Sequence, residues 1–111
     1  MAETDELAGR IEQAASTFDG IERTVGESGV EYAIAGVTFA AVGMGRAAFR
    51  LRPDIADAAL HTPGVRALDR GPGWIELQPA ELDRFAIDRA TSWFAAAARH
   101  AAEGERGRRV H

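Results

Sequence analysis

The chain has 111 residues, of which 46% are hydrophobic, and this composition predicts one folded domain with an ordinary apolar core. It contains no cysteine and no lysine, which excludes disulfides, thiolate nucleophiles, sulfur-based zinc sites, Schiff bases and a phosphate-loop lysine. The net charge of −4 is not that of a typical nucleic-acid-binding domain, which is usually basic.

The first segment of the chain has the pattern of a helix. Leu7, Ile11 and Phe18 recur at helical spacing, and charged residues fall elsewhere around the wheel. Thr4 suits the N-cap position, and Gly20 is a natural stop. The sequence therefore predicts an N-terminal helix that ends before residue 20.

From residue 30 the apolar period changes from 3.6 to 2 residues. Three short alternating runs, VEYAI, VTFAAV and AAFRLR, are separated by glycine-containing turns, at residues 35–36 and 43–46. In the second run, Val37, Phe39 and Ala41 share one face, opposite Thr38 and its neighbours at alternate positions. This pattern predicts an antiparallel meander with one apolar face.

The remaining elements alternate between helix and strand. Pro53 opens a short helix over residues 53–60, residues 61–73 form a loop, and WIELQ at 74–78 supplies a fourth strand. Pro79 then begins a long helix whose apolar stripe includes Phe85, Trp93 and Phe94. We expect residues 1–103 to form a single domain and residues 104–111 to be a frayed tail.

This element order predicts an α+β fold of two layers. An antiparallel sheet of about four strands carries the N-terminal helix, the short middle helix and the long C-terminal helix on one face. The opposite face of the sheet is then open.

The alternation assigns particular side chains to that open face. Ile75 and Leu77 form the core pair of the fourth strand, so Trp74 shares the opposite face with Arg50. Residues 32–75 contain five arginines and three acids, and guanidinium groups stack on aromatic rings and pair with phosphate or carboxylate. The predicted binding residues are Arg46, Arg50, Arg52, Arg66, Arg70 and Trp74. Trp74 has two other interpretations, an edge residue folded into the core and a dimer contact.

The element order and several short motifs resemble the MmcQ/YjbR family of small bacterial proteins. FDGIERTV at 18–25 is similar to the family's Pro-Gly-x-Glu lead-in, with Asp19 in place of proline. Residues 37–60 resemble its strand–turn–strand–helix block, GWIELQ at 73–78 its Trp-led strand, and residues 80–98 its closing helix. The resemblance implies a double-wing α+β fold that is suspected of DNA binding and has no established catalytic activity.

No motif indicates an enzyme. His61, His100 and His111 are scattered, GMGR at 43–46 has the pattern of a hairpin turn, and no serine stands in a Gly-x-Ser-x-Gly elbow. We therefore predict no catalytic residue, no metal and no cofactor.

The functional hypothesis is a small interaction module that binds nucleic acid or an acidic protein through the arginine-bearing face. The first alternative is a protein-interaction or self-association domain, with the long helix forming a homodimer, and the second is a small-molecule-binding domain or enzyme. The acidic start of the sequence does not resemble a secretory signal, and no apolar run reaches membrane-spanning length, so we expect a cytoplasmic protein.

Overall fold

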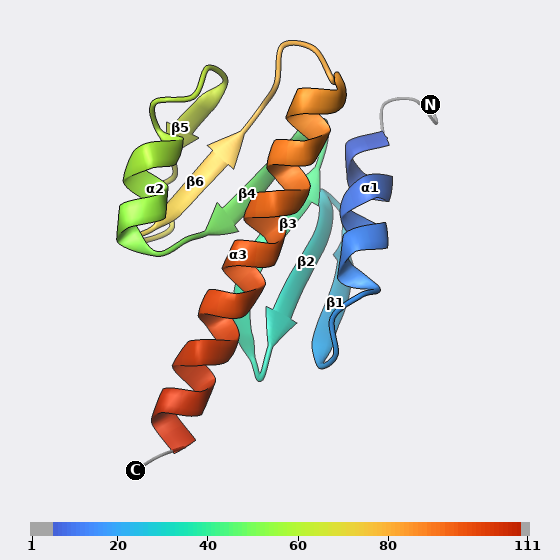
Figure 1. Cartoon of the computed structure of the whole chain (residues 1–111). Coiled ribbons are helices and arrows are strands. Elements are labelled where there is room, and N and C mark those ends of the chain that lie inside the picture. Colours follow the sequence, from blue (N-terminus) through green and yellow to red (C-terminus); the bar gives the residue numbers. More distant parts are fainter. Residues whose placement is uncertain (1–5, 110–111) are drawn as a thin grey trace.

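The computed structural model describes the backbone of residues 6–109 and the side chains of residues 6–103. This part of the chain forms three helices and six strands (Figure 1). In chain order they are α1 (Glu6–Ala15), β1 (Ile21–Gly26), β2 (Gly29–Ile34), β3 (Val37–Gly43), β4 (Arg46–Arg50), α2 (Pro53–Ala59), β5 (Val65–Ala67), β6 (Trp74–Leu77) and α3 (Arg84–Arg109).

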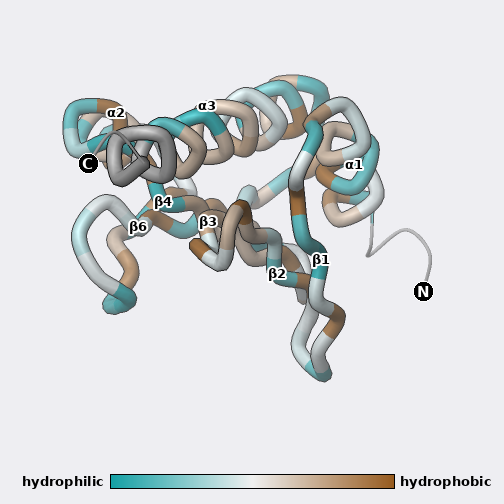
Figure 2. The backbone as a smooth tube through the Cα atoms, turned by 90° about the horizontal axis from the view of Figure 1, so that it is seen from below, coloured by the Kyte–Doolittle hydropathy of each residue, from teal (hydrophilic) through white to brown (hydrophobic). Residues whose placement is uncertain are grey.

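The strands form one antiparallel sheet in the order β1-β2-β3-β4-β6-β5. The helices lie on one face of this sheet, as the end-on view of Figure 2 shows, and α3 runs diagonally across the central strands. The predicted α+β class with an antiparallel sheet is therefore confirmed. Within residues 6–109, no helix combines the length and the apolar character that crossing a membrane requires.

The sheet has six strands where the alternation predicted about four. The additional strands, β1 and β5, lie at the two edges of the sheet. Only Ile21 of β1 is even partly buried, so this strand has no apolar face to alternate. β5 has three residues, which is too short for a period of two to be recognised. The predicted loop over residues 61–73 therefore contains a strand.

The second strand of the predicted meander, β3, departs from simple alternation. Tyr32 pairs with Ala40 and Ala33 pairs with Thr38, so Phe39 is an extra residue in β3. Such a bulge shifts the side-chain pattern by one position. Phe39 and Ala40 are both fully buried, and Ala41 falls on the open face. The prediction that Ala41 shares the core face with Phe39 was therefore wrong.

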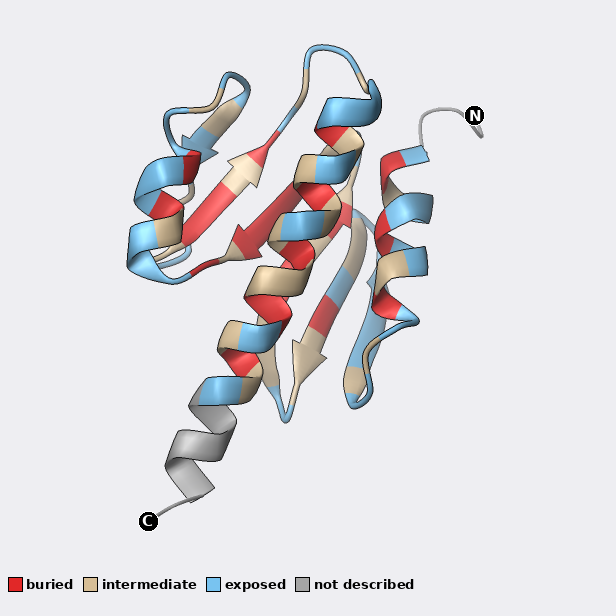
Figure 3. Cartoon of the chain, viewed as in Figure 1, coloured by how far each residue is buried: buried red, intermediate tan, exposed pale blue. Residues whose placement is uncertain are grey.

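The core lies between the sheet and the helix layer, and Figure 3 shows the buried positions on the inner sides of α1 and α3 and along the central strands. Phe94 of α3 is fully buried at its centre. Its ring makes edge-to-face contacts with Phe18, Tyr32 and Phe39 at centroid distances of 6.2, 5.2 and 5.3 Å. These contacts join α3 to the sheet and to the segment after α1.

α3 begins later than the sequence pattern predicts. Its first residue is Arg84 rather than Pro79, and the Asp83 carboxylate accepts a hydrogen bond of 2.9 Å from the backbone N–H of Ala86. This contact caps the start of the helix. Phe85, predicted to belong to the apolar stripe, lies in this first turn and is 69% exposed, so it is not part of the core.

Candidate binding trough on the open face of the sheet

The register places one row of side chains across the face opposite the helices. From β1 to β5 the paired residues are Thr24, Glu31, Ala41, Ala48, Glu76 and Arg66. Small residues occupy the centre of this row and charged residues flank it. The open face therefore has a low floor with charged groups on both sides.

This face is hollowed rather than flat. The β1–β2 hairpin and the segment between β5 and β6 both extend from the sheet on the side away from the helices (Figure 2). Between them lies a hollow of about 490 Å³, which we call the trough. Its floor includes Ala41 and Ala48, and its charged lining residues are Glu31, Arg46, Arg70 and Glu76.

Glycines allow the β1–β2 hairpin to lie close to the end of β3. A Cβ atom at Gly43 would collide with the carbonyl oxygen of Ser28, and one at Gly29 would collide with the carbonyl oxygen of Val42. Gly29 also has a φ of +146°, which side-chain-bearing residues rarely adopt. These two positions therefore fix the wall of the trough that the hairpin forms.

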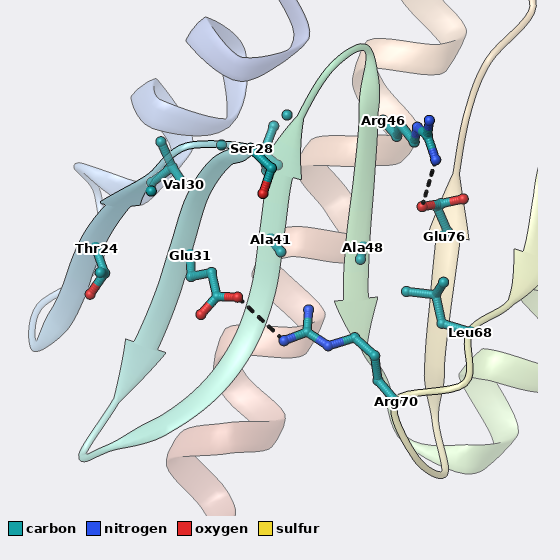
Figure 4. Close-up of a pocket in the computed structure, with 14 residues that line it drawn as sticks. Thr24, Ser28, Val30, Glu31, Ala41, Arg46, Ala48, Leu68, Arg70 and Glu76 are labelled. Atoms are coloured by element: carbon teal, nitrogen blue, oxygen red, sulfur yellow. Dashed lines mark hydrogen bonds and ion pairs between the residues drawn. The ribbon is translucent and has the colours of Figure 1, made fainter.

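Arg70 lies across the trough (Figure 4). Its guanidinium lies 4.3 Å from the centroid of the Trp74 ring, and its Nη2 atom is 3.4 Å from a carboxylate oxygen of Glu31 on β2. Strands β3 and β4 lie between β2 and β6 in the sheet. Arg70 thus connects the segment between β5 and β6 with the far side of the hollow.

Trp74 is buried, with 8% of its surface exposed. Its partner in the register is Arg50, which places both residues on the open face, and Trp74 is not part of the cluster beneath the helices. The Arg70 guanidinium lies over its ring, and Gly71 lies beside it. Trp74 is therefore not an open stacking platform, and it does not fold into the core either: it is an edge residue on the open face that Arg70 covers.

The carboxylate of Glu76 holds two arginines. Its oxygens lie 2.8 Å from Nε of Arg66 and 3.8 Å from a terminal nitrogen of Arg46, and its side chain is only 12% exposed. The buried Nε of Arg46 has no hydrogen-bond partner among the described residues. These pairs orient two guanidinium groups at one end of the trough and offset part of their charge.

The structure brings most of the predicted binding residues to this face. Arg46 and Arg70 line the trough, Arg66 lies beside it on β5, and Arg50 forms no ion pair with the residues that the structure describes. Arg52 is separate from them, because β4 ends at Arg50 and the chain turns into α2. There the Arg52 guanidinium lies 3.4 Å from the Asp54 carboxylate.

Sequence reasoning did not identify the two acidic lining residues as part of the site. The alternation places Glu31 and Glu76 on the open face, but their arginine partners come from distant segments of the chain. Arg70 is 39 residues from Glu31, and Arg66 is 10 residues from Glu76. The strand register brings Arg66 beside Glu76, and the course of the segment between β5 and β6 brings Arg70 to Glu31; local alternation shows neither.

A second polar cluster lies on the helix side of the sheet. One carboxylate oxygen of Glu12 accepts hydrogen bonds from the Tyr32 hydroxyl at 2.7 Å and from Nε of Arg23 at 2.8 Å. Both bonds lower the pKa of Glu12, that from Tyr32 most strongly, whereas burial and the same carboxylate raise the pKa of Tyr32 to about 12. This cluster fastens α1 to the sheet and borders a second hollow of about 630 Å³.

Among the described residues, no group of three or more histidine or acidic side chains is arranged to hold a metal ion. Comparisons with protein-family models, with curated proteins and with solved structures gave no match. The resemblance to the MmcQ/YjbR family therefore stays a prediction.

Proposed function

We propose that this chain is a non-enzymatic interaction module that binds an anionic partner in the trough. The observation that carries the proposal is the gathering of four arginines on the one sheet face that the helices leave uncovered. The register places Arg46, Arg50 and Arg66 there, and Arg70 reaches over the same face from the segment between β5 and β6. Guanidinium groups present planar pairs of N–H donors that match carboxylate and phosphate oxygens.

Nucleic acid is the first candidate partner, in agreement with what the family resemblance implies. If four arginines each neutralised one phosphate of a single strand, the logarithm of the affinity would fall with the logarithm of salt concentration with a slope of about −2.8. This slope is modest compared with that of proteins that cover a broad stretch of backbone.

An acidic protein segment is the second candidate, and one observation favours it. Three of the four arginines already lie within 4 Å of a carboxylate, supplied by Glu31 or Glu76. These glutamates reduce the positive potential that would attract a densely charged phosphate backbone, but the same contacts show carboxylate oxygens fitting beside the guanidinium groups.

Two dye-labelled probes test the proposal, a single-stranded oligonucleotide and a poly-glutamate peptide, with binding followed by fluorescence anisotropy at several salt concentrations. We expect one probe to bind at low salt and Arg46→Ala/Arg50→Ala to weaken it at least tenfold. Arg99→Ala, which removes an exposed arginine from α3 in the helix layer, should change the affinity less than twofold. Absence of binding by both probes, or equal losses in the two variants, would contradict the proposal.

A further inference from the structure

The contact between Arg70 and Glu31 joins opposite sides of the trough. Arg70 belongs to the segment that leads into β6, and Glu31 belongs to β2, with β3 and β4 between them (Figure 4). In the other ion pairs of the open face, Glu76 of β6 meets arginines of the adjacent strands β4 and β5. Arg70 and Glu31 therefore occupy the space that a partner would have to enter.

The ion pair between Arg70 and Glu31 is weak enough for another carboxylate to take the place of Glu31. The two side chains are 38% and 52% exposed, and exposed pairs of this kind contribute little net stability because water and salt screen them. The other contact of the guanidinium, with the ring of Trp74, does not depend on Glu31. Loss of Glu31 as a partner would therefore leave the Arg70 guanidinium in place with free N–H donors.

We infer that Glu31 is an internal occupant of a carboxylate-binding site, and that an aspartate or glutamate side chain of an acidic peptide replaces it on Arg70. This inference rests on the proposed function and specifies the partner and its regulation. The guanidinium already holds a carboxylate oxygen at 3.4 Å, so the geometry accepts that group. Glu76 on the trough lining already pairs with Arg46 and Arg66, which lowers the positive potential that a continuous phosphodiester backbone would need beyond Arg70.

If Glu31 competes with the incoming peptide for Arg70, substitutions of Glu31 and of Arg70 should change the affinity for the peptide in opposite directions. Glu31→Gln keeps the size of the side chain and removes its charge, so an incoming carboxylate meets a free Arg70. We expect this variant to bind an acidic peptide up to about fivefold more tightly, which corresponds to about 1 kcal/mol. Arg70→Gln removes the receiving group and should weaken binding at least tenfold.

Opposite signs separate this mechanism from a structural role. If the ion pair only stabilised the shape of the trough, breaking it from either side would weaken binding. Glu81→Gln is the matched control, because it changes the net charge equally from the segment before α3. Any gain in affinity that comes only from the less negative net charge of the chain will appear in this control as well.

The experiment measures the affinity of a dye-labelled poly-glutamate peptide for the full chain and the three variants by fluorescence anisotropy. A second readout uses Trp74 as the single tryptophan in a Trp93→Phe background, since the chain has two tryptophans. We expect peptide binding to alter Trp74 emission, because Arg70 lies on its ring. Circular dichroism checks that every variant is folded.

The outcomes distinguish failure of this inference about Glu31 from failure of the proposed function. Tighter binding by Glu31→Gln than by Glu81→Gln, together with a loss in Arg70→Gln, supports the inference. Equal affinities for the two glutamine variants of the acids, or wild-type affinity in Arg70→Gln, overturn it. Binding of an oligonucleotide but not of the peptide overturns this inference and leaves the proposed function standing, whereas binding of neither probe refutes the proposed function as well.

Discussion

Substitution of Phe94 tests how the helix layer is held to the sheet. The side chain is fully buried and contacts three aromatic rings, so Phe94→Ala should lose about 4–5 kcal/mol, near the upper end of the usual range for such changes. Phe94→Leu keeps most of the apolar volume but loses the three ring contacts, each worth about 0.5–1.5 kcal/mol. We expect a loss of about 2–3 kcal/mol for this variant.

These losses are large beside a total stability of about 5–15 kcal/mol for a domain of ordinary size. Urea unfolding followed by circular dichroism measures them, provided that the dependence on urea stays the same between variants. Phe85→Leu is the control, since Phe85 lies on the same helix but is 69% exposed, and we expect a change within about 0.5 kcal/mol. A Phe94→Leu variant as stable as wild type, or an equal loss in Phe85→Leu, would refute the assigned core.

Further predictions concern the hairpin wall and the polar cluster beneath α1. Gly43→Ala should destabilise the chain by about 2–3 kcal/mol in the same assay, because its Cβ would collide with the Ser28 carbonyl, whereas Gly9→Ala in α1 meets open space and should stabilise it by about 0.5–1 kcal/mol. Equal effects of the two changes would contradict the close approach. Because folding raises the pKa of Tyr32 to about 12, its protonated hydroxyl contributes fully to the free energy of unfolding below pH 10, and this contribution should be lost between pH 10 and about pH 12. Tyr32→Phe should remove that part of the pH dependence of unfolding. The lowered pKa of Glu12 has the opposite sign, so its contribution is present above pH 4.5 and declines in acid; a Glu12→Gln variant with an unchanged acid limb would show that this carboxylate plays no part.

Around β4, in contrast to β3, the alternation predicted correctly which side chains face the helices. Phe49 and Leu51 are 0% and 1% exposed, whereas Arg50 lies on the opposite face and Arg52 is exposed. The prediction succeeds at these residues because one sheet face packs on the core while the other meets solvent. Under that condition an apolar period of two shows which face a side chain is on.

The rest of the fold could not be predicted because its signals are not local. β1 is an edge strand with almost no buried side chain, and the bulge at Phe39 depends on pairing with β2. The burial of Trp74 likewise depends on Arg70 lying over its ring. Local alternation assigns a side chain to a face, but it does not show which other segment covers that face.

A partner that occupies the trough would shield the residues that line it, and the absence of cysteine from the chain allows this shielding to be measured directly. Thr24→Cys places a single thiol on the trough lining, and Ser92→Cys places one on the exposed side of α3. The rate of thiol labelling is then measured without probe and with saturating oligonucleotide or acidic peptide. If a partner binds in the trough, the bound probe slows labelling of the Thr24→Cys variant several-fold and leaves the Ser92→Cys variant unchanged. Slower labelling only in the Ser92→Cys variant, or unchanged labelling in both, would contradict binding in the trough.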